Sequence, residues 1–194
     1  AFDGCTALSA ITIPASVTTI EEYAFNGCLG LKNVVFSENS SLTTINQYVF
    51  YECDALTSVT IPDSVTSISA NSFRNCDNLA SVTIPESVTT IGKYAFYQCK
   101  SLTSIAIPDG VTSIGGNAFC NCNNLKSIII SNKLVSINSL AFADCHSLTS
   151  ITYNGTVSQF SAINLGSYWG LSTGNFTIYC NDGKIAKNGT VTYY

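Results

Sequence analysis

A single motif recurs along most of the chain at an almost fixed interval. The stretch LASVTIPESVTTIGKYAFYQC, residues 79–99, has near copies before and after it. One phenylalanine and one cysteine mark the same place in each copy: Phe2, Phe25, Phe50, Phe73, Phe96, Phe119 and Phe142, with Cys5, Cys28, Cys53, Cys76, Cys99, Cys122 and Cys145. The cysteines recur with one constant period, and only the step from Cys28 to Cys53 is longer, by two positions. Such a period indicates a solenoid in which each unit stacks on its neighbours.

A solenoid grows by units, so chain length alone does not set its number of domains. We expect one continuous array over residues 1–152, with about seven units of which the first is partial. Residues 153–194 then form a degenerate last repeat and a C-terminal cap. A lone unit buries too few apolar side chains to offset the entropy of ordering its backbone, so the units must stack to fold.

Each unit contains two kinds of local pattern. Residues 79–84 and 88–91 place β-branched residues among serines and threonines, which is typical of short strands with one buried face. Proline cannot donate to a strand ladder, so Pro85 marks the end of the first strand. The alternation disappears in residues 93–97, where we predict one helical or 3₁₀ turn per unit. The predicted fold class is therefore a repeat solenoid of mainly short parallel β-strands.

The repeat decays after Thr149. Four later apolar residues still match the strand columns, namely Ile151, Tyr153, Val157 and Phe160. From Phe176 a different pattern begins, with a turn signal at residues 181–183 and an Asn-Gly pair at 188–189. Asn-Gly between strand-like runs is the strongest short-range hairpin signal. We predict a C-terminal β-hairpin cap that covers the last apolar face and blunts the open edge.

Nine cysteines could suggest a disulfide framework, but their spacing argues against one. Column cysteines should lie about 4.8 Å apart with parallel side chains, whereas a disulfide needs side chains that turn toward each other. We interpret them as buried thiols that pack as small hydrophobes. Cys120 and Cys180 lie outside the column; whether they are free stays open, and Cys120 occupies a position expected to be exposed. Cys120-x-Cys122 lacks a second pair or a histidine, which argues against zinc.

Charge and hydropathy exclude several classes of protein. With a net charge of -4 and 10% charged residues, the chain has no basic face for nucleic acid. No run approaches the roughly 18 apolar residues of a membrane span, and no charged n-region followed by an apolar h-region marks a signal peptide within these residues. The chain starts inside a repeat and contains no Met, so we expect a fragment of a longer protein.

The sequence offers little that could carry catalysis or hold a metal. His146, the only histidine, follows Cys145 in a variable turn, and that cysteine belongs to the core column. Asp63, Glu86 and Asp109 form a column after the prolines, which we interpret as a solvated corner, with a weak cation site as the alternative. We predict no catalytic residue, no metal site, no cofactor and no enzymatic activity.

Two surfaces are candidates for binding. Serine and threonine columns predict a flat hydroxyl-rich face, which can bind a β-edge, a glycan or a protein. Regular threonines also allow ice binding, although such residues simply suit exposed strands. On the turn face, tyrosines offer larger anchors, unless the rings only pack along the edge of the stack. These are Tyr23, Tyr48, Tyr51, Tyr94 and Tyr97.

Two further features each have a structural and a functional interpretation. Trp169, the only tryptophan, either packs over the last coil or offers a platform on which a ligand stacks. Between Phe36 and Leu42 the chain reads SENSS, where other units have a tighter link. The two extra residues should bulge from the surface without disturbing the core register. Such an insertion either lies on a binding face or reflects tolerated drift.

The unit consensus L-x-x-I-x-I-P-x-x-V-x-x-I-x-x-x-A-F-x-x-C resembles the BspA-like leucine-rich repeat family over residues 1 to about 160. The segments ITYNGTVSQFSAI and TIYCNDGKI also resemble the terminal part of these bacterial arrays. The resemblance implies a leucine-rich repeat array on a secreted or surface-exposed bacterial protein. It also implies an adhesin that binds host extracellular-matrix proteins or other cells.

Taken together, these observations predict a non-enzymatic extracellular or cell-surface binding module. Its partner would be a protein or glycan on host or neighbouring cells, and we expect a monomer that binds no nucleic acid and inserts into no membrane. The alternative is a spacer or targeting array attached to a catalytic domain outside these residues. The candidate binding residues are the five tyrosines of the turn face and Trp169.

Overall fold

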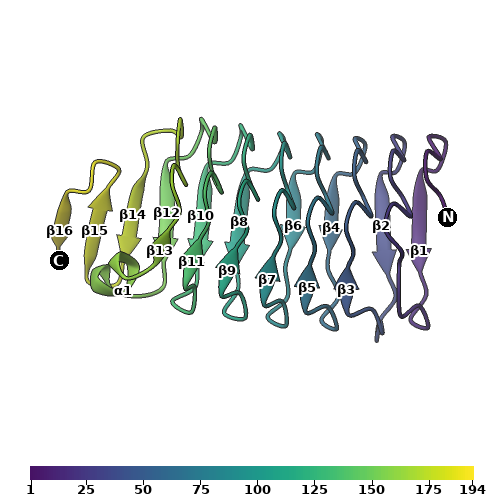
Figure 1. Ribbon diagram of the computed structural model, residues 1–194, viewed down its shortest axis with the longest axis horizontal. Helices are drawn as coiled ribbons and strands as arrows, with labels where there is room; N and C mark the ends of the chain where they lie inside the picture. The colour runs from purple at the N-terminus through teal and green to yellow at the C-terminus, as the bar shows by residue number, and fades with distance from the viewer.

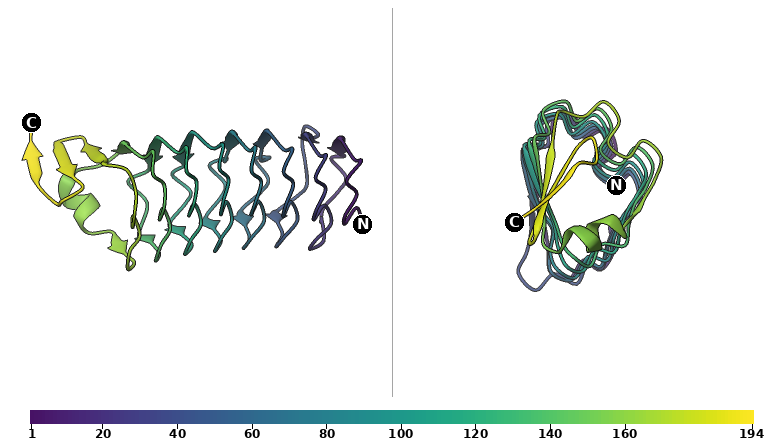
Figure 2. Two further views of the ribbon diagram at one scale, coloured as in Figure 1. Left: turned by 90° about the horizontal axis from the view of Figure 1, so that it is seen from above. Right: turned by 90° about the vertical axis from the view of Figure 1, so that its left-hand side faces the viewer.

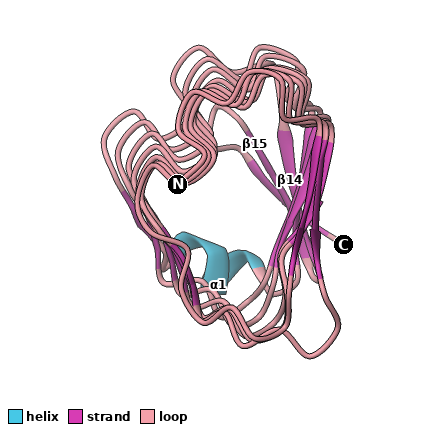
Figure 3. Cartoon of the chain, turned by 90° about the vertical axis from the view of Figure 1, so that its right-hand side faces the viewer, coloured by secondary structure: helices cyan, strands magenta, loops and turns pink.

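The computed structural model describes residues 1–194 and shows a rod of stacked coils, with the two termini at opposite ends (Figure 1). Viewed along the rod, successive coils follow nearly the same outline and place strands on two of its sides (Figure 3). The single helix, α1 (Val157–Ser161), has five residues, so no helix could span a membrane.

The first side carries one strand from every coil. These strands are β1 (Ala10–Ile13), β2 (Asn33–Phe36), β4 (Ser58–Thr60), β6 (Ser81–Thr83), β8 (Ser104–Ile107), β10 (Ser127–Ile130), β12 (Ser150–Tyr153) and β14 (Thr177–Cys180). Neighbours pair in parallel at equivalent repeat positions, as in Ser127 with Ser150. The pairing stops between β6 and β8, so this side consists of two sheets.

The second side carries shorter strands of two residues each. They are β3 (Thr44–Ile45), β5 (Ser67–Ile68), β7 (Thr90–Ile91), β9 (Ser113–Ile114), β11 (Ser136–Ile137) and β13 (Asn164–Leu165). They form one parallel six-stranded sheet. The predicted solenoid of short parallel strands is confirmed, and its strands lie where the alternating pattern placed them.

The predicted helical or 3₁₀ turn in each unit is wrong. Tyr94 and Gln98 both have left-handed backbone with φ of 58°, which interrupts any helix. Backbone N–H groups alternate in direction: Tyr97 donates within its own coil to Tyr94, whereas Phe96 donates to Ala118 of the next coil at 2.8 Å. A helix would satisfy all these donors internally. The segment instead forms consecutive β-turns, in which every second backbone N–H group donates to a carbonyl oxygen of the next coil.

The core is a set of residue columns that run the length of the rod. Phenylalanine rings from Phe2 to Phe142 stack with centroids 5.2–5.4 Å apart and planes within 15° of parallel. Five of these rings are fully buried, namely Phe50, Phe73, Phe96, Phe119 and Phe142. Each ring therefore packs against two others, and aromatic pairs contribute beyond the area that they bury.

The cysteine column lies beside the phenylalanine column, and all nine cysteines are free. Six column thiols lie 3.0–3.3 Å from the carbonyl oxygen of the phenylalanine in the preceding coil, as Cys99 does from Phe73. The thiols are thus weak donors as well as small hydrophobes. Burial raises the pKa of these thiols, to about 12 for Cys145.

Cys120 is buried, so the expected exposure of this residue is wrong. Its column neighbours Arg74 and Tyr97 are themselves half-buried, and the shorter thiol is covered almost completely by its own neighbours. Asn121 Nδ2 lies 3.4 Å and Asp144 Oδ2 lies 4.0 Å from Cys120 Sγ. Burial, followed by the charge of Asp144, raises the pKa of Cys120 to about 11.

Thiol titration checks this arrangement. In the native chain a soluble thiol reagent should modify one cysteine rapidly, because Cys5 alone is exposed. After denaturation in the absence of reductant, all nine thiols should react. Finding three or more disulfides, or rapid modification of several native thiols, would contradict the buried column.

The C-terminal end departs from the repeat in two ways. Asn164 pairs with Ser136, so the last coil exceeds the regular period by the five residues that α1 occupies. Val157 and Phe160 are buried residues of this helix, so the prediction that they match the strand columns is wrong. Thr156 and Gln159 form a reciprocal capping box at the start of the helix. β15 (Gly183–Ala186) and β16 (Val191–Tyr193) extend the first side in antiparallel order, which confirms the predicted hairpin cap.

The insertion at residues 37–41 projects beyond the outline of all other coils (Figures 2 and 3). Leu42 and Ile45 after it stay buried, so the core register is intact, as expected. The strands beside the insertion separate: β2 and β4 pair only between Asn33 and Ser58, whereas β1 and β2 pair over four positions. The insertion therefore opens the sheet locally.

Candidate binding surface

The turn face brings the five predicted tyrosines together in one continuous cluster. Tyr23 and Tyr48 stack with centroids 4.7 Å apart, and Tyr48 meets the edge of Tyr51 at 5.7 Å. Farther along the rod, Tyr94 and Tyr97 meet edge to face at 5.5 Å. Between the two groups lies a coil whose equivalent of Tyr48 and Tyr94 is Asn71.

Arg74 fills this interval. Its guanidinium carbon lies 5.8 Å from the ring centroid of Tyr51, 5.3 Å from Tyr94 and 5.1 Å from Tyr97. Cation–π contacts of this kind stabilise a guanidinium by roughly 0.5–2 kcal/mol each, with more where water is excluded. We call Tyr23, Tyr48, Tyr51, Arg74, Tyr94 and Tyr97 the tyrosine–arginine surface.

Sequence reasoning missed Arg74, although a signal was present. Tyr51, Arg74 and Tyr97 are each separated by one full repeat, so they occupy the same position in three successive coils. The guanidinium of Arg74 therefore had to lie between two rings.

The charge of Arg74 is not neutralised by a carboxylate. The one ion pair in the chain joins Lys100 to Asp77 at 2.7 Å. Arg74 donates from Nη1 to Asn71 Oδ1 at 3.2 Å, and its buried Nε has no partner. The guanidinium is thus held in a fixed orientation by rings while keeping unused donors.

The tyrosine hydroxyls give the surface its polar contacts. Asn121 Nδ2 donates to Tyr97 Oη at 3.3 Å. Burial, and after it the neighbouring Glu52, raises the pKa of Tyr51, so its hydroxyl stays protonated well above neutral pH. Tyr23 is exposed and the other four tyrosines are half-buried, so each ring shows one part to solvent and packs with the rest.

Trp169 lies outside this surface, near the C-terminal end of the rod. Its ring meets Phe142 at 6.4 Å nearly edge-on and Phe176 at 5.6 Å. The ring is half-buried and packs over the last stacked phenylalanine. Its remaining exposed part is separate from the tyrosines.

The residues weighed for catalysis or metal binding do not converge. Cys145 is buried with its thiol directed to the Phe119 carbonyl, whereas His146 is exposed with Nδ1 2.7 Å from the Ser172 carbonyl oxygen. In the acidic column, Glu86 accepts a hydrogen bond from the Asp109 backbone at 2.8 Å. No three His, Cys, Asp or Glu side chains gather closely enough to hold a metal ion.

The hydroxyl-rich face uses part of its hydrogen bonding along the rod. Thr89 Oγ1 donates to the Thr66 carbonyl at 3.1 Å, and Ser67 bonds to Thr90 at 3.2 Å. These hydroxyls of the second side join neighbouring coils, whereas Ser58 and Thr60 of the first side make no such bond. Neither side has the cluster of tyrosine and arginine side chains that makes the tyrosine–arginine surface the richer set of anchors for a ligand.

Several solved structures of bacterial leucine-rich repeat proteins are similar to this chain. A leucine-rich repeat protein of T. pallidum matches with a TM-score of 0.69 and 26% identity, covering 77% of this chain and 75% of that one. A leucine-rich cell surface protein of Faecalibacterium prausnitzii matches at 0.52 and 23%, covering 84% of this chain. A leucine-rich repeat protein from Eubacterium ventriosum matches with a TM-score of 0.54 and 32% identity, covering 77% of this chain. The chain spans 64% and 43% of the latter two proteins.

A search of curated proteins gave no match. The sequence profile of the BspA type leucine-rich repeat region matches in six copies, over residues 1–58 and 43–163. These ranges include every coil that carries the cysteine and phenylalanine columns. The chain belongs to the BspA-type leucine-rich repeat family.

Proposed function

We propose that this chain is a non-enzymatic, extracellular adhesin-type module that binds a protein or glycan on host or neighbouring cells through its tyrosine–arginine surface. The family and its bacterial leucine-rich repeat neighbours suggest a repeat interaction module. One neighbour is described as a cell surface protein, which supports an extracellular setting.

The observation that carries the proposal is the composition and order of the surface. Tyrosine and arginine dominate the energetically important positions of protein interfaces. Tyrosine buries a large area with little loss of side-chain freedom. Here the stacked and edge-to-face contacts fix the rings before any ligand arrives. Fixing Arg74 among three rings likewise lowers the entropy lost on binding. These features favour a protein as the partner of this surface.

A binding screen tests the proposal directly. The purified chain should bind at least one member of a panel of extracellular-matrix proteins and cell-surface glycans. If the chain bound no member of the panel, the result would contradict the proposal and favour the alternative, a spacer or targeting array beside a catalytic domain. That alternative also predicts a catalytic domain in the full-length parent protein, which its sequence would reveal.

A further inference from the structure

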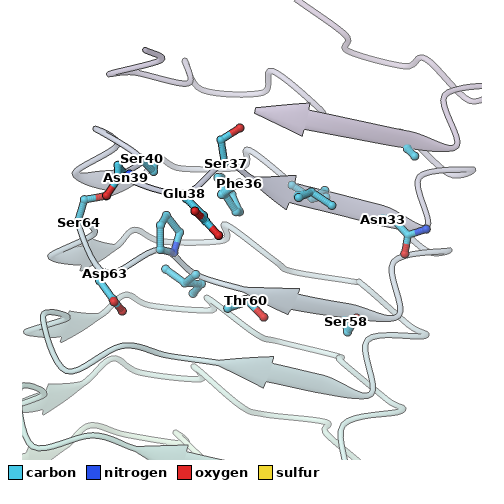
Figure 4. Close-up of a pocket in the computed structure, with 15 residues that line it drawn as sticks. Asn33, Phe36, Ser37, Glu38, Asn39, Ser40, Ser58, Thr60, Asp63 and Ser64 are labelled. Carbon is cyan, nitrogen blue, oxygen red and sulfur yellow. The ribbon is translucent and has the colours of Figure 1, made fainter. Parts of the chain in front are cut away.

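A groove opens beside the insertion, between β2 and β4 (Figure 4). Its volume is about 870 Å³, within the range of about 300–1,000 Å³ typical of small-molecule sites. The groove exists because the two extra residues let the strands separate after their single pairing of Asn33 with Ser58. No residue of the tyrosine–arginine surface lines it.

Two hydrogen bonds hold the wall of the groove in place. Ser64 Oγ donates to the Leu42 carbonyl at 2.6 Å, and Ser40 Oγ accepts from the Leu42 backbone at 3.3 Å. Ser87 makes the equivalent bond to Val65 one coil later, so the insertion is anchored by a regular feature of the repeat. The wall is therefore built into the fold.

The other polar side chains that line the groove are not used within the chain. Asn33 and Ser58 lie at one end, Glu38 and Asp63 at the other, and Thr60 lies between them (Figure 4). Neither these five side chains nor those of Ser37 and Asn39, which also line the groove, make a side-chain hydrogen bond in the protein, whereas Glu86, the equivalent of Asp63, accepts one from Asp109. Unused amide, hydroxyl and carboxylate groups thus lie along the length of one groove.

The charged and apolar side chains that line the groove limit the kinds of ligand that it can bind. No lysine, arginine or histidine lines it, so two carboxylates make it repel anions. Phe36 is half-buried and lines the same groove, where its ring offers an apolar face beside the polar groups. An apolar ligand would displace water from the exposed carboxylates without replacing its hydrogen bonds. A molecule with many hydroxyls and apolar C–H faces would match both features.

We propose that this groove is a second binding site, which takes a neutral saccharide. The carboxylates of Glu38 and Asp63 and the amide of Asn33 would accept and donate hydrogen bonds to sugar hydroxyls. Phe36 would pack against a C–H face of one ring. This site goes beyond the proposed function, because it uses other residues and another side of the coil than the tyrosine–arginine surface.

Chemical-shift titration of the full chain tests the site with four neutral probes: maltotetraose, chitotetraose, mannotetraose and lacto-N-neotetraose. At least one should shift amide signals of residues 33–40 and 58–64 in a saturable way. Sialylated lacto-N-neotetraose should bind at least about tenfold more weakly than its neutral form if the latter binds, because the carboxylates repel it. Silence from all four neutral probes would overturn the proposal.

Variants locate the binding. Replacing residues 37–41 by Pro-Asp-Ser, the sequence at 62–64, restores the regular corner and should abolish the shifts while the chain stays folded. The pair Glu38→Gln and Asp63→Asn should weaken binding about tenfold or more. Glu86→Gln, in the same column but outside the groove, should have no effect. Unchanged saccharide binding in the corner variant would refute the site.

Two other ligand classes give distinct outcomes. Calcium chloride that shifts the same signals in the absence of any saccharide response would assign the groove to a cation instead. A Ser-Thr-rich decapeptide that binds there in preference to all four sugars would assign it to protein. Either result overturns the saccharide proposal and leaves the tyrosine–arginine surface to be judged by its own test.

Discussion

Raising the pH from 8 to 10 should remove about 7 kcal/mol of folding stability, a large part of the roughly 5–15 kcal/mol that stabilises a typical protein. The cause is the cysteine column. Eight of the nine thiols are buried, and burial raises the pKa furthest in five of them: Cys53, Cys76, Cys99, Cys122 and Cys145. Burial, and for most of them the next thiol in the column, raises their pKa above the ordinary value of 9.0.

Folding stability decreases as the pH rises because the unfolded chain loses its thiol protons at a lower pH than the folded chain does. Below pH 9.0 the thiols are protonated in both states, so the stability is fully present. Above it the unfolded chain ionises while the folded chain does not, so stability falls as the pH rises toward the folded pKa of about 12 for Cys145. Each thiol then costs about 1.4 kcal/mol per pH unit.

Urea denaturation with reductant at pH 8, 9 and 10 measures this loss. Cys99→Ala should reduce the pH dependence by about one fifth, because it removes one of the five thiols whose pKa is raised furthest. Cys5→Ala is the matched control, since that thiol is exposed and its removal should leave the dependence as it was. Equal stability at pH 8 and pH 10 would contradict the buried column.

Removal of one central ring should also have a large effect. Phe96 is fully buried and stacks between Phe73 and Phe119, 5.2 Å from each. Phe96→Ala should lower the free energy of unfolding by about 3–5 kcal/mol, because it removes the buried ring and leaves a cavity inside the stack. Since each coil contacts only its neighbours, the cavity also weakens the junction between two halves of the rod.

Phe2→Ala is the matched control in the same column. Phe2 is 39% exposed and stacks on one ring only, so its removal should cost much less. Urea denaturation followed by circular dichroism compares both variants with the parent chain. Similar small losses for Phe2→Ala and Phe96→Ala would show that the rings do not form a continuous stack.

The residue spacing was enough to predict the columns of the fold. A solenoid repeats its contacts in the same order as its sequence, so a phenylalanine or cysteine at the same place in every repeat had to stack on its equivalent. The hairpin after Phe176 could be predicted for a similar reason, because its turn chemistry is local. Both predictions depend on contacts that sequence distance determines.

The turn was wrong because its hydrogen bonds are not local. The left-handed backbone of Tyr94 and Gln98 becomes favourable when alternate donors reach the next coil, which no single unit reveals. Cys120 was misplaced because side-chain length, and not column position, decides exposure there. Helix α1 depends on a cap from Thr156 and on Asp182 Oδ1, which accepts from the Val157 backbone at 2.7 Å. That contact joins segments that are distant in the sequence.

The candidate surface was found only in part. Tyrosines are recognisable as anchors from their type alone, whereas the importance of Arg74 lies in its three ring neighbours. The groove was beyond prediction, because the two extra residues indicated a bulge but not the separation of β2 from β4. The boundary between array and cap at residues 152 and 153 stays a prediction.

The most direct test measures affinity for the ligand found in the screen, using the parent chain, Arg74→Ala, Arg74→Lys and Tyr97→Ala. Each variant should weaken binding by at least about 2 kcal/mol, a factor of roughly 30. Arg74→Lys should do so although it keeps the charge, because lysine lacks the planar group that packs between rings. Tyr168→Ala removes an exposed tyrosine outside the surface and should bind like the parent. Unchanged affinity in the Arg74 and Tyr97 variants, with the fold intact by circular dichroism, would contradict binding through the tyrosine–arginine surface.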